Sequence, residues 1–181
     1  MARYAAFLRG INLGRNRRIT GAQLRSLFGG MGFEDVATFR TSGNVVFGAD
    51  REPMAGMTDR VEGSLRDSLG YEVAVFLRTA AEVQAIAGHQ PFDRELVERA
   101  EGKLQVVMIS AKPVASARKE LLALATDEDR IALGDRDLYW LPSGGIRDSA
   151  LDPKAIEKLV GPATVRTKGT IERLAAKYFP G

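Results

Sequence analysis

The order of apolar segments over residues 3–78 constrains the fold of this chain more than any other feature. Tyr4–Arg9 is a short apolar run that predicts a strand. After a glycine-containing loop, apolar residues recur at i, i+3, i+4 and i+7, the spacing of one helical face. These residues are Leu24, Leu27, Phe28 and Met31. Thr20 can cap the start of this helix, and Gly32 can end it in a left-handed conformation.

A hairpin, a second helix and another strand are predicted to follow. Val36–Arg40 and Val45–Phe47 are predicted strands, and Thr41–Asn44 forms the turn between them because Gly and Asn tolerate a positive φ. A helix is predicted over residues 53–70, where apolar residues recur at every fourth position. These are Met57, Val61, Leu65 and Leu69. Tyr71–Leu77 is the clearest strand pattern in the chain.

The resulting order, β-α-β-β-α-β, predicts a ferredoxin-like unit, in which a four-stranded antiparallel sheet carries two helices on one face. The second half of the chain repeats this order of elements, although the residues themselves do not match. We therefore predict an α+β protein with a ferredoxin-like unit at residues 1–78 and a helical connection at 79–101. A second, similar unit with a C-terminal helix is predicted at 102–181.

Two motifs of this chain are similar to a known family. They are Leu8–Gly14 (LRGINLG) and Ser42–Phe47 (SGNVVF), and the chain resembles the bacterial family filed as domain of unknown function 1697 over nearly its whole length. The resemblance implies an α+β, ferredoxin-like arrangement and implies no activity. Near the C-terminus, Arg166 is followed by Thr167, Lys168 and Gly169, where the family usually has Asn, an aromatic residue and Asn.

Positive charge is concentrated in the N-terminal quarter of the chain. Residues 1–47 contain seven arginines against Glu34 and Asp35, a net charge of +5, so the rest of the chain sums to −2 within a total of +3. A local basic field attracts phosphates or carboxylates, and salt weakens it. Ordinary surface arginines, solvated or paired, would give the same composition.

The topology predicts a shared edge for two segments that are distant in sequence. The first and third strands of such a sheet are antiparallel neighbours, so the first ends beside the start of the third. Arginine offers a fork of donors that matches phosphate or carboxylate, and glycines let main-chain N–H groups approach a ligand. We predict an anion site lined by Arg9, Gly10, Asn12, Gly14, Arg40, Ser42, Gly43 and Asn44, joined by Arg166 if the two halves pack together.

A structural explanation of the same residues stays open. In that explanation Gly10 and Gly14 only turn a long loop, and Asn12 and Asn44 close it through side-chain hydrogen bonds. Arg9 would then pair with an acid.

Several other chemistries are excluded. The chain has no cysteine and a single histidine, His89, which excludes disulfides, thiolate nucleophiles and multi-histidine metal centres. The chain contains neither glycine-rich nucleotide-binding motif, G-x-x-x-x-G-K-[ST] or G-x-G-x-x-G. It also lacks the G-x-S-x-G motif of a serine nucleophile. His89 lies in a predicted loop, where a surface residue is more common than a lone general base. We predict no cofactor and no metal, and the sequence does not decide whether the protein is an enzyme.

Three functions fit these features. The first is the binding of a small ligand that carries phosphate or carboxylate, and the second is salt-sensitive binding of nucleic acid. The second lacks the paired aromatic residues that stack bases, since, apart from Tyr4, Phe7 and Phe47 are the only rings on the two strands. The third is self-association without catalysis, and the oligomeric state stays open.

The chain is also expected to be cytoplasmic and to have no membrane partner. No apolar run approaches the roughly 18 residues that cross a bilayer. Arg9 interrupts the apolar N-terminal segment too early for a secretory signal.

Overall fold

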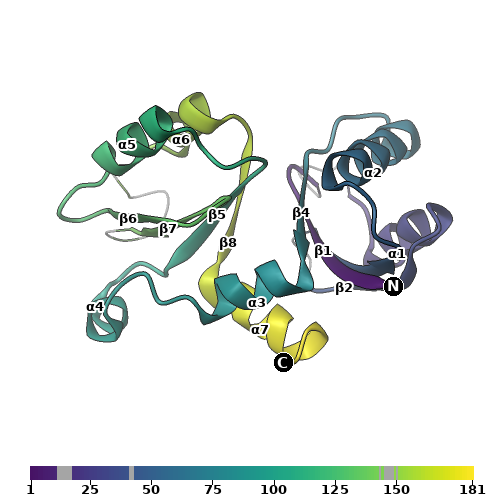
Figure 1. Cartoon of the computed structure of the whole chain (residues 1–181), viewed down its shortest axis with the longest axis horizontal. Helices are drawn as coiled ribbons and strands as arrows, with labels where there is room; N and C mark the ends of the chain where they lie inside the picture. The colour runs from purple at the N-terminus through teal and green to yellow at the C-terminus, as the bar shows by residue number, and fades with distance from the viewer. Residues whose placement is uncertain (12–17, 41–42, 143, 145–148, 150) are drawn as a thin grey trace. The chain divides into compact units, whose positions relative to one another are not determined.

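The chain forms two compact units, each built around an antiparallel sheet. The computed structural model describes residues 1–11, 18–40, 43–142, 144, 149 and 151–181. The first unit comprises residues 1–84 together with 174–181, and the second comprises residues 85–173. Each unit contains a four-stranded sheet, with strand order β2-β3-β1-β4 in the first and β6-β7-β5-β8 in the second (Figure 1). Both orders are ferredoxin-like, which confirms the predicted α+β fold.

The first unit contains the predicted succession of elements. These are β1 (Ala2–Leu8), α1 (Gly21–Gly30), β2 (Glu34–Thr38), β3 (Asn44–Ala49), α2 (Met54–Leu69) and β4 (Val75–Thr79). The predicted strand at Tyr71–Leu77 begins later than expected, at Val75. Val75 pairs with Leu8, the last residue of β1, and the N–H of Arg9 donates to the carbonyl of Ala74. The residues before Ala74 have no part of β1 beside them, so they do not join the sheet.

Local signals explain where the first two helices begin and end. Thr20 accepts a hydrogen bond from the N–H of Gln23, whose side chain accepts one from the N–H of Thr20, which makes a capping box. The left-handed φ of +77° at Gly70 ends α2. The residues of α1 and α2 that face the sheet are buried in one apolar core with alternate residues of β1 and β3, among them Leu24, Phe28, Met57, Val61, Leu65, Tyr4 and Phe47.

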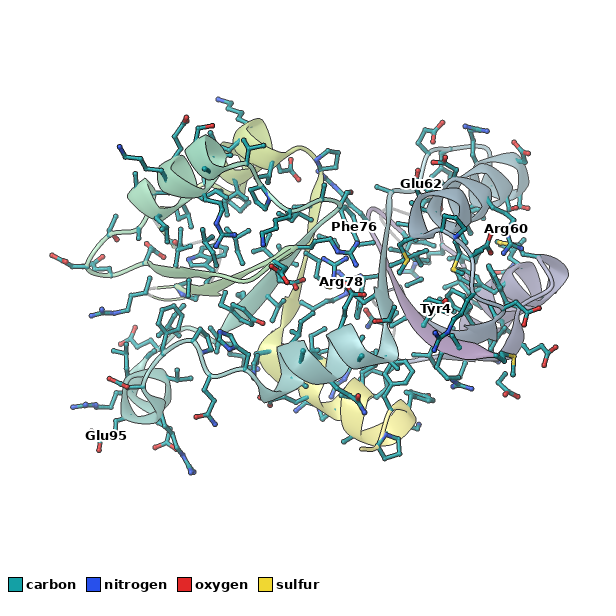
Figure 2. The ribbon with its side chains drawn as sticks, in the orientation of Figure 1. Tyr4, Arg60, Glu62, Phe76, Arg78 and Glu95 are labelled. Carbon is teal, nitrogen blue, oxygen red and sulfur yellow. The ribbon has the colours of Figure 1, made fainter. Side chains whose placement is uncertain are left out.

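Two polar side chains of α2 join it to neighbouring segments (Figure 2). A guanidinium nitrogen of Arg60 donates to the carbonyl of Met31 at 2.8 Å, and the guanidinium lies 4.6 Å from the centre of the Phe33 ring. The carboxylate of Glu62 accepts a hydrogen bond from the N–H of Val75 at 2.9 Å. These contacts fix α2 against the end of α1 and the start of β4.

The second unit repeats the strand and helix order of the first. After α3 (Ala80–Gly88), which begins in the first unit, come α4 (Arg94–Arg99), β5 (Gln105–Ile109), α5 (Ala115–Ala123), β6 (Arg130–Leu133), β7 (Asp137–Leu141), α6 (Pro153–Val160), β8 (Ala163–Thr167) and α7 (Lys168–Tyr178). α5 and α6 cover one face of this sheet (Figure 1). Their core contains Leu121, Ile156 and the fully buried Trp140, whose indole N–H donates to Asp129.

Membrane-spanning helices and clusters of metal ligands are both absent from the described residues. Within them, no helix combines the length and apolar character that spanning a bilayer requires. The same residues contain no group of three or more His, Asp or Glu side chains arranged to hold a metal ion.

Candidate functional site

The end of β1 and the turn before β3 lie together at one rim of the first sheet. The N–H of Leu8 donates to the carbonyl of Gly43 at 2.8 Å, and Phe7 is paired with Asn44 across the two strands. A Cβ atom built on Gly43 would lie 2.6 Å from the Cγ2 of Ile11. Residues on either side of Gly10 therefore contact Gly43, although the two glycines are distant in sequence.

Positive φ angles are concentrated at this rim. Gly10 has a φ of +72° and Gly43 a φ of +73°, values that glycine adopts without strain. Arg40 has a φ of +59°, which is uncommon for a residue with a side chain. Its guanidinium lies 5.6 Å from the centre of the Phe39 ring, and the residue is exposed. The turn thus presents one arginine side chain to solvent.

Arg9 directly follows β1 and is half-buried. Its N–H donates to the carbonyl of Ala74 at 2.9 Å, which fixes its main chain between the start of β3 and the start of β4. Four chain segments therefore meet at this rim, and they come from the ends of β1 and β2 and the starts of β3 and β4. We refer to Arg9, Gly10, Arg40, Gly43 and Asn44 as the β1–β3 rim.

Asn44 is almost completely buried and closes the hairpin turn. Its side-chain nitrogen donates to the carbonyl of Phe39 at 3.0 Å, and the N–H of Phe39 donates to the carbonyl of Asn44 at 2.9 Å. These two bonds across the turn fix the direction in which Arg40 leaves the sheet. Asn44 thus makes the side-chain hydrogen bond that a purely structural role predicts. Its contact with a ligand stays a prediction.

The other predicted site residues do not belong to the described part of the rim. Asn12, Gly14 and Ser42 lie outside the described residues. Arg166 belongs to β8 in the second unit, where its guanidinium donates to the hydroxyl of Thr164 at 2.8 Å and to the carbonyl of Val165 at 2.9 Å. Burial lowers the pKa of the Arg166 guanidinium to about 10.

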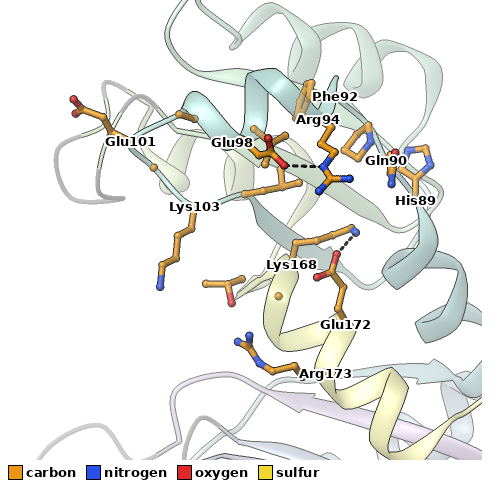
Figure 3. Close-up of a pocket in the computed structure, with 17 residues that line it drawn as sticks. His89, Gln90, Phe92, Arg94, Glu98, Glu101, Lys103, Lys168, Glu172 and Arg173 are labelled. Atoms are coloured by element: carbon orange, nitrogen blue, oxygen red, sulfur yellow. Dashed lines mark hydrogen bonds and ion pairs between the residues drawn. The ribbon is translucent and has the colours of Figure 1, made fainter.

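The second unit has a cavity of about 680 Å³ that the sequence analysis did not predict (Figure 3). Four segments line it: the loop at residues 89–92, α4, residues 100–104, and residues 167–173 at the end of β8 and the first two turns of α7. The His89 ring lies 4.8 Å from the ring of Tyr139 in β7. Trp140, the next residue, is in the core under α5 and α6, so this loop lies against the other face of the sheet.

Charged side chains of the cavity are arranged in pairs. The Nε of Arg94 donates to Glu98 at 2.7 Å on α4, and the Nζ of Lys168 donates to Glu172 at 2.8 Å on α7. The Nζ of Lys168 also donates to the carbonyl of Ala87 at 2.8 Å. The hydrogen bond that Arg94 donates to Glu98 raises the pKa of its guanidinium above its ordinary value.

Three residues that the sequence analysis noted do line this cavity. Thr167, Lys168 and Gly169 line it, and they are the residues at which the chain departs from the C-terminal pattern of the family that it resembles. This departure alone could not predict a pocket. The opposite wall comes from residues 89–104, and only folding brings that segment next to residues 167–169.

Comparison with known proteins supports the fold and the family. The conserved bacterial protein SP0830 from Streptococcus pneumoniae has a similar structure, with a TM-score of 0.70, 17% sequence identity and 98% of each chain covered. At this identity the similarity shows the fold alone. No curated protein matches the chain. The model of the protein family DUF1697, described as a protein of unknown function, matches residues 1–139. Because this match covers well over half of the 181 residues, the chain belongs to the DUF1697 family.

Proposed function

We propose that the protein binds a small ligand bearing a phosphate or carboxylate group at the β1–β3 rim. The observation that carries the proposal is the contact of Gly43 with Leu8 and Ile11, since it brings the segments of Arg9 and Arg40 to one end of the sheet. Two guanidinium groups near one another can bind a single anion from two sides. A site of this kind uses residues from separate loops held by a rigid sheet.

The main chain supports the same ligand class. Gly10 and Gly43 both have a positive φ, and Gly10 has no side chain to keep a ligand away from its peptide groups, whereas at Gly43 the space of a side chain is taken by Ile11. Main-chain N–H groups in such turns form concave sites for anions. Asn44 has a positioning role in this proposal, because its hydrogen bond to Phe39 holds the turn that carries Arg40.

The small ligand is preferred over nucleic acid because of where the aromatic rings lie. The rings of the two central strands belong to Tyr4, Phe7 and Phe47, and all three are buried, so none of them can stack on a base. Binding of a long polyanion would have to depend on phosphate contacts alone, with a steep dependence on salt.

Titration calorimetry with inorganic phosphate, pyrophosphate and citrate, supported by thermal-shift measurements, tests the proposal. Arg9→Ala should weaken binding of the anion that binds by about tenfold, the usual effect of removing a hydrogen bond to a charged group. Arg40→Ala should weaken it in the same direction. Arg51→Ala is the matched control, because Arg51 is an exposed arginine of the same unit outside the rim.

Two results would contradict the proposal. One is an Arg9→Ala variant that binds these anions as tightly as the original chain. The other is binding of a single-stranded RNA oligomer, abolished by moderate salt, by a protein that binds none of the three small anions. The second result would move the function to the nucleic-acid class.

A further inference from the structure

We propose that the cavity of the second unit is a separate binding site for a small amphipathic anion, a molecule with an apolar ring or chain and one phosphate or carboxylate group. The cavity lies wholly within residues 89–173, so the proposal is independent of the β1–β3 rim. Its volume of about 680 Å³ falls within the range of pockets that bind drug-sized ligands.

A buried lysine lines the cavity. Lys168 is only 7% exposed, and its ammonium group contacts the Glu172 carboxylate and the Ala87 carbonyl, each at 2.8 Å. An ammonium group has three N–H donors. Within the part of the chain that the structure describes, no third acceptor lies within hydrogen-bond distance of the Lys168 nitrogen. The ammonium is already paired with one carboxylate, and its third N–H can donate to an oxygen atom of a ligand.

The first turn of α7 adds a main-chain donor beside this lysine. The N–H of Lys168 donates to the carbonyl of Leu104, and the N–H of Thr170 donates to the hydroxyl of Thr167. The N–H of Gly169, between them, has no acceptor among the described residues. Because Gly169 lacks a side chain, a ligand atom can approach this N–H directly.

Arg173 lies at the same corner of the cavity. Its guanidinium nitrogens are 3.5 and 3.6 Å from the position that a Cβ of Gly169 would take. The residue is exposed, and Figure 3 shows its guanidinium below Lys168, on the wall formed by α7. A planar guanidinium beside a main-chain N–H is suited to a carboxylate or phosphate.

The balance of charge around the cavity also favours an anion. Glu98 is neutralised by Arg94 and Glu172 by Lys168. Lys103 and Arg173 then face a single further acid of the lining, Glu101, whose carboxylate lies on the far side of the close-up from Arg173 (Figure 3). Among the described residues of the lining, the unpaired positive charge therefore lies at Lys103 and at Arg173 on α7.

The remaining wall is apolar, so the part of the ligand beyond its anionic group should be apolar as well. Phe92, Val97 and Leu104 line the cavity, and all three are partly exposed. A ligand that covers them removes apolar surface from water, which gives a gain that inorganic phosphate alone cannot give. A phosphate or carboxylate that carries an aromatic ring or a short alkyl chain can contact both the basic wall at α7 and this apolar wall.

The experiment is a titration of the full chain, labelled with nitrogen-15, followed by NMR, with phenyl phosphate as the probe. We expect saturable shifts in the amide signals of Thr167, Lys168 and Gly169, and weaker binding of inorganic phosphate. Arg173→Gln, which changes an exposed side chain, should weaken binding of phenyl phosphate by about tenfold. Lys119→Gln is the matched control, because Lys119 is an exposed cation of the same unit outside the cavity.

Three outcomes would overturn the proposal. The cavity amides do not shift, Arg173→Gln binds phenyl phosphate as tightly as the original chain, or inorganic phosphate binds as tightly as phenyl phosphate. Arg9→Ala separates the two sites, since it should leave binding in the cavity unchanged. A probe that is lost with Arg9→Ala and retained with Arg173→Gln supports the β1–β3 rim and rejects the cavity.

Discussion

Gly43 is restricted by its own backbone and by a neighbour from another part of the chain. Its φ of +73° is strained for a residue with a Cβ, and that Cβ would lie 2.6 Å from Ile11. We expect Gly43→Ala to lower the free energy of unfolding by about 2–3 kcal/mol, from strain and overpacking together. Urea denaturation measures this loss.

Gly29→Ala is the control for this prediction. Gly29 lies within α1, and a Cβ there would meet nothing within 4 Å. Alanine favours the helix, so this variant should be slightly more stable than the original chain. Equal stability of the two variants would show that the contact between Gly43 and Ile11 is not needed at the rim.

The roles of single polar residues were only partly predictable from the sequence. The preference of asparagine for turns predicted a turn position for Asn44, whereas in the structure it is the first residue of β3 and only its side chain bonds across the turn. Its hydrogen bond to Phe39 depends on the register of the hairpin, which residue types alone do not set. Arg166 was predicted from its charge, whereas its burial depends on the packing around β8.

At the scale of elements, α1 depends on the capping box at its start. Both bonds between Thr20 and Gln23 are made in exposed positions, at 2.8 and 3.1 Å. Thr20→Ala removes the hydroxyl that satisfies the N–H of Gln23, and should cost about 1 kcal/mol of stability. Thermal unfolding followed by circular dichroism measures the change.

Ser26→Ala provides the comparison within the same helix. Ser26 is an exposed residue in the middle of α1, where alanine has the higher helix propensity. Its substitution should raise the stability slightly or leave it unchanged. If Thr20→Ala and Ser26→Ala behave alike, the capping box does not determine where α1 begins.

Elements with strong local signals were predicted, and those without were not. The helix over residues 53–70 has a regular apolar period and a glycine stop, and α2 closely matches it. α4 has no buried residue in its six positions, so no apolar period marks it, and only a helical connection was predicted there. Its ion pairs from Arg94 to Glu98 and from Arg99 to Glu95 are typical of an exposed helix.

At the scale of the whole molecule, the repeated strand order was predictable and the cavity was not. The order follows from the succession of strands and helices along the chain. The cavity depends on close approach between distant residues. A Cβ on Gly102 would clash with the main-chain carbonyls of Pro142 and Gly144, so only glycine fits there. No local pattern marks this contact in the sequence.

The C-terminal residues 174–181 belong to the first unit, although the rest of that unit is formed by residues 1–84. The hydroxyl of Tyr178 donates to the carbonyl of Thr38 at 3.4 Å, and the side chain of Gln84 donates to the carbonyl of Phe179 at 2.8 Å. Phe179 is itself 5% exposed. We therefore expect Phe179→Ala to destabilise the first unit by about 3 kcal/mol, the usual cost of truncating a buried phenylalanine.

Hydrogen exchange followed by mass spectrometry locates the effect of Phe179→Ala. Because units of a protein can open separately, peptides from β2 and β3 should lose protection more than peptides from β5 and β7. Pro180→Ala, an exposed neighbour in the same segment, should leave both sheets protected. An equal loss of protection in the two sheets would mean that the segment stabilises the chain as a whole. Unchanged protection in β2 and β3 would mean that these residues do not hold the first unit together.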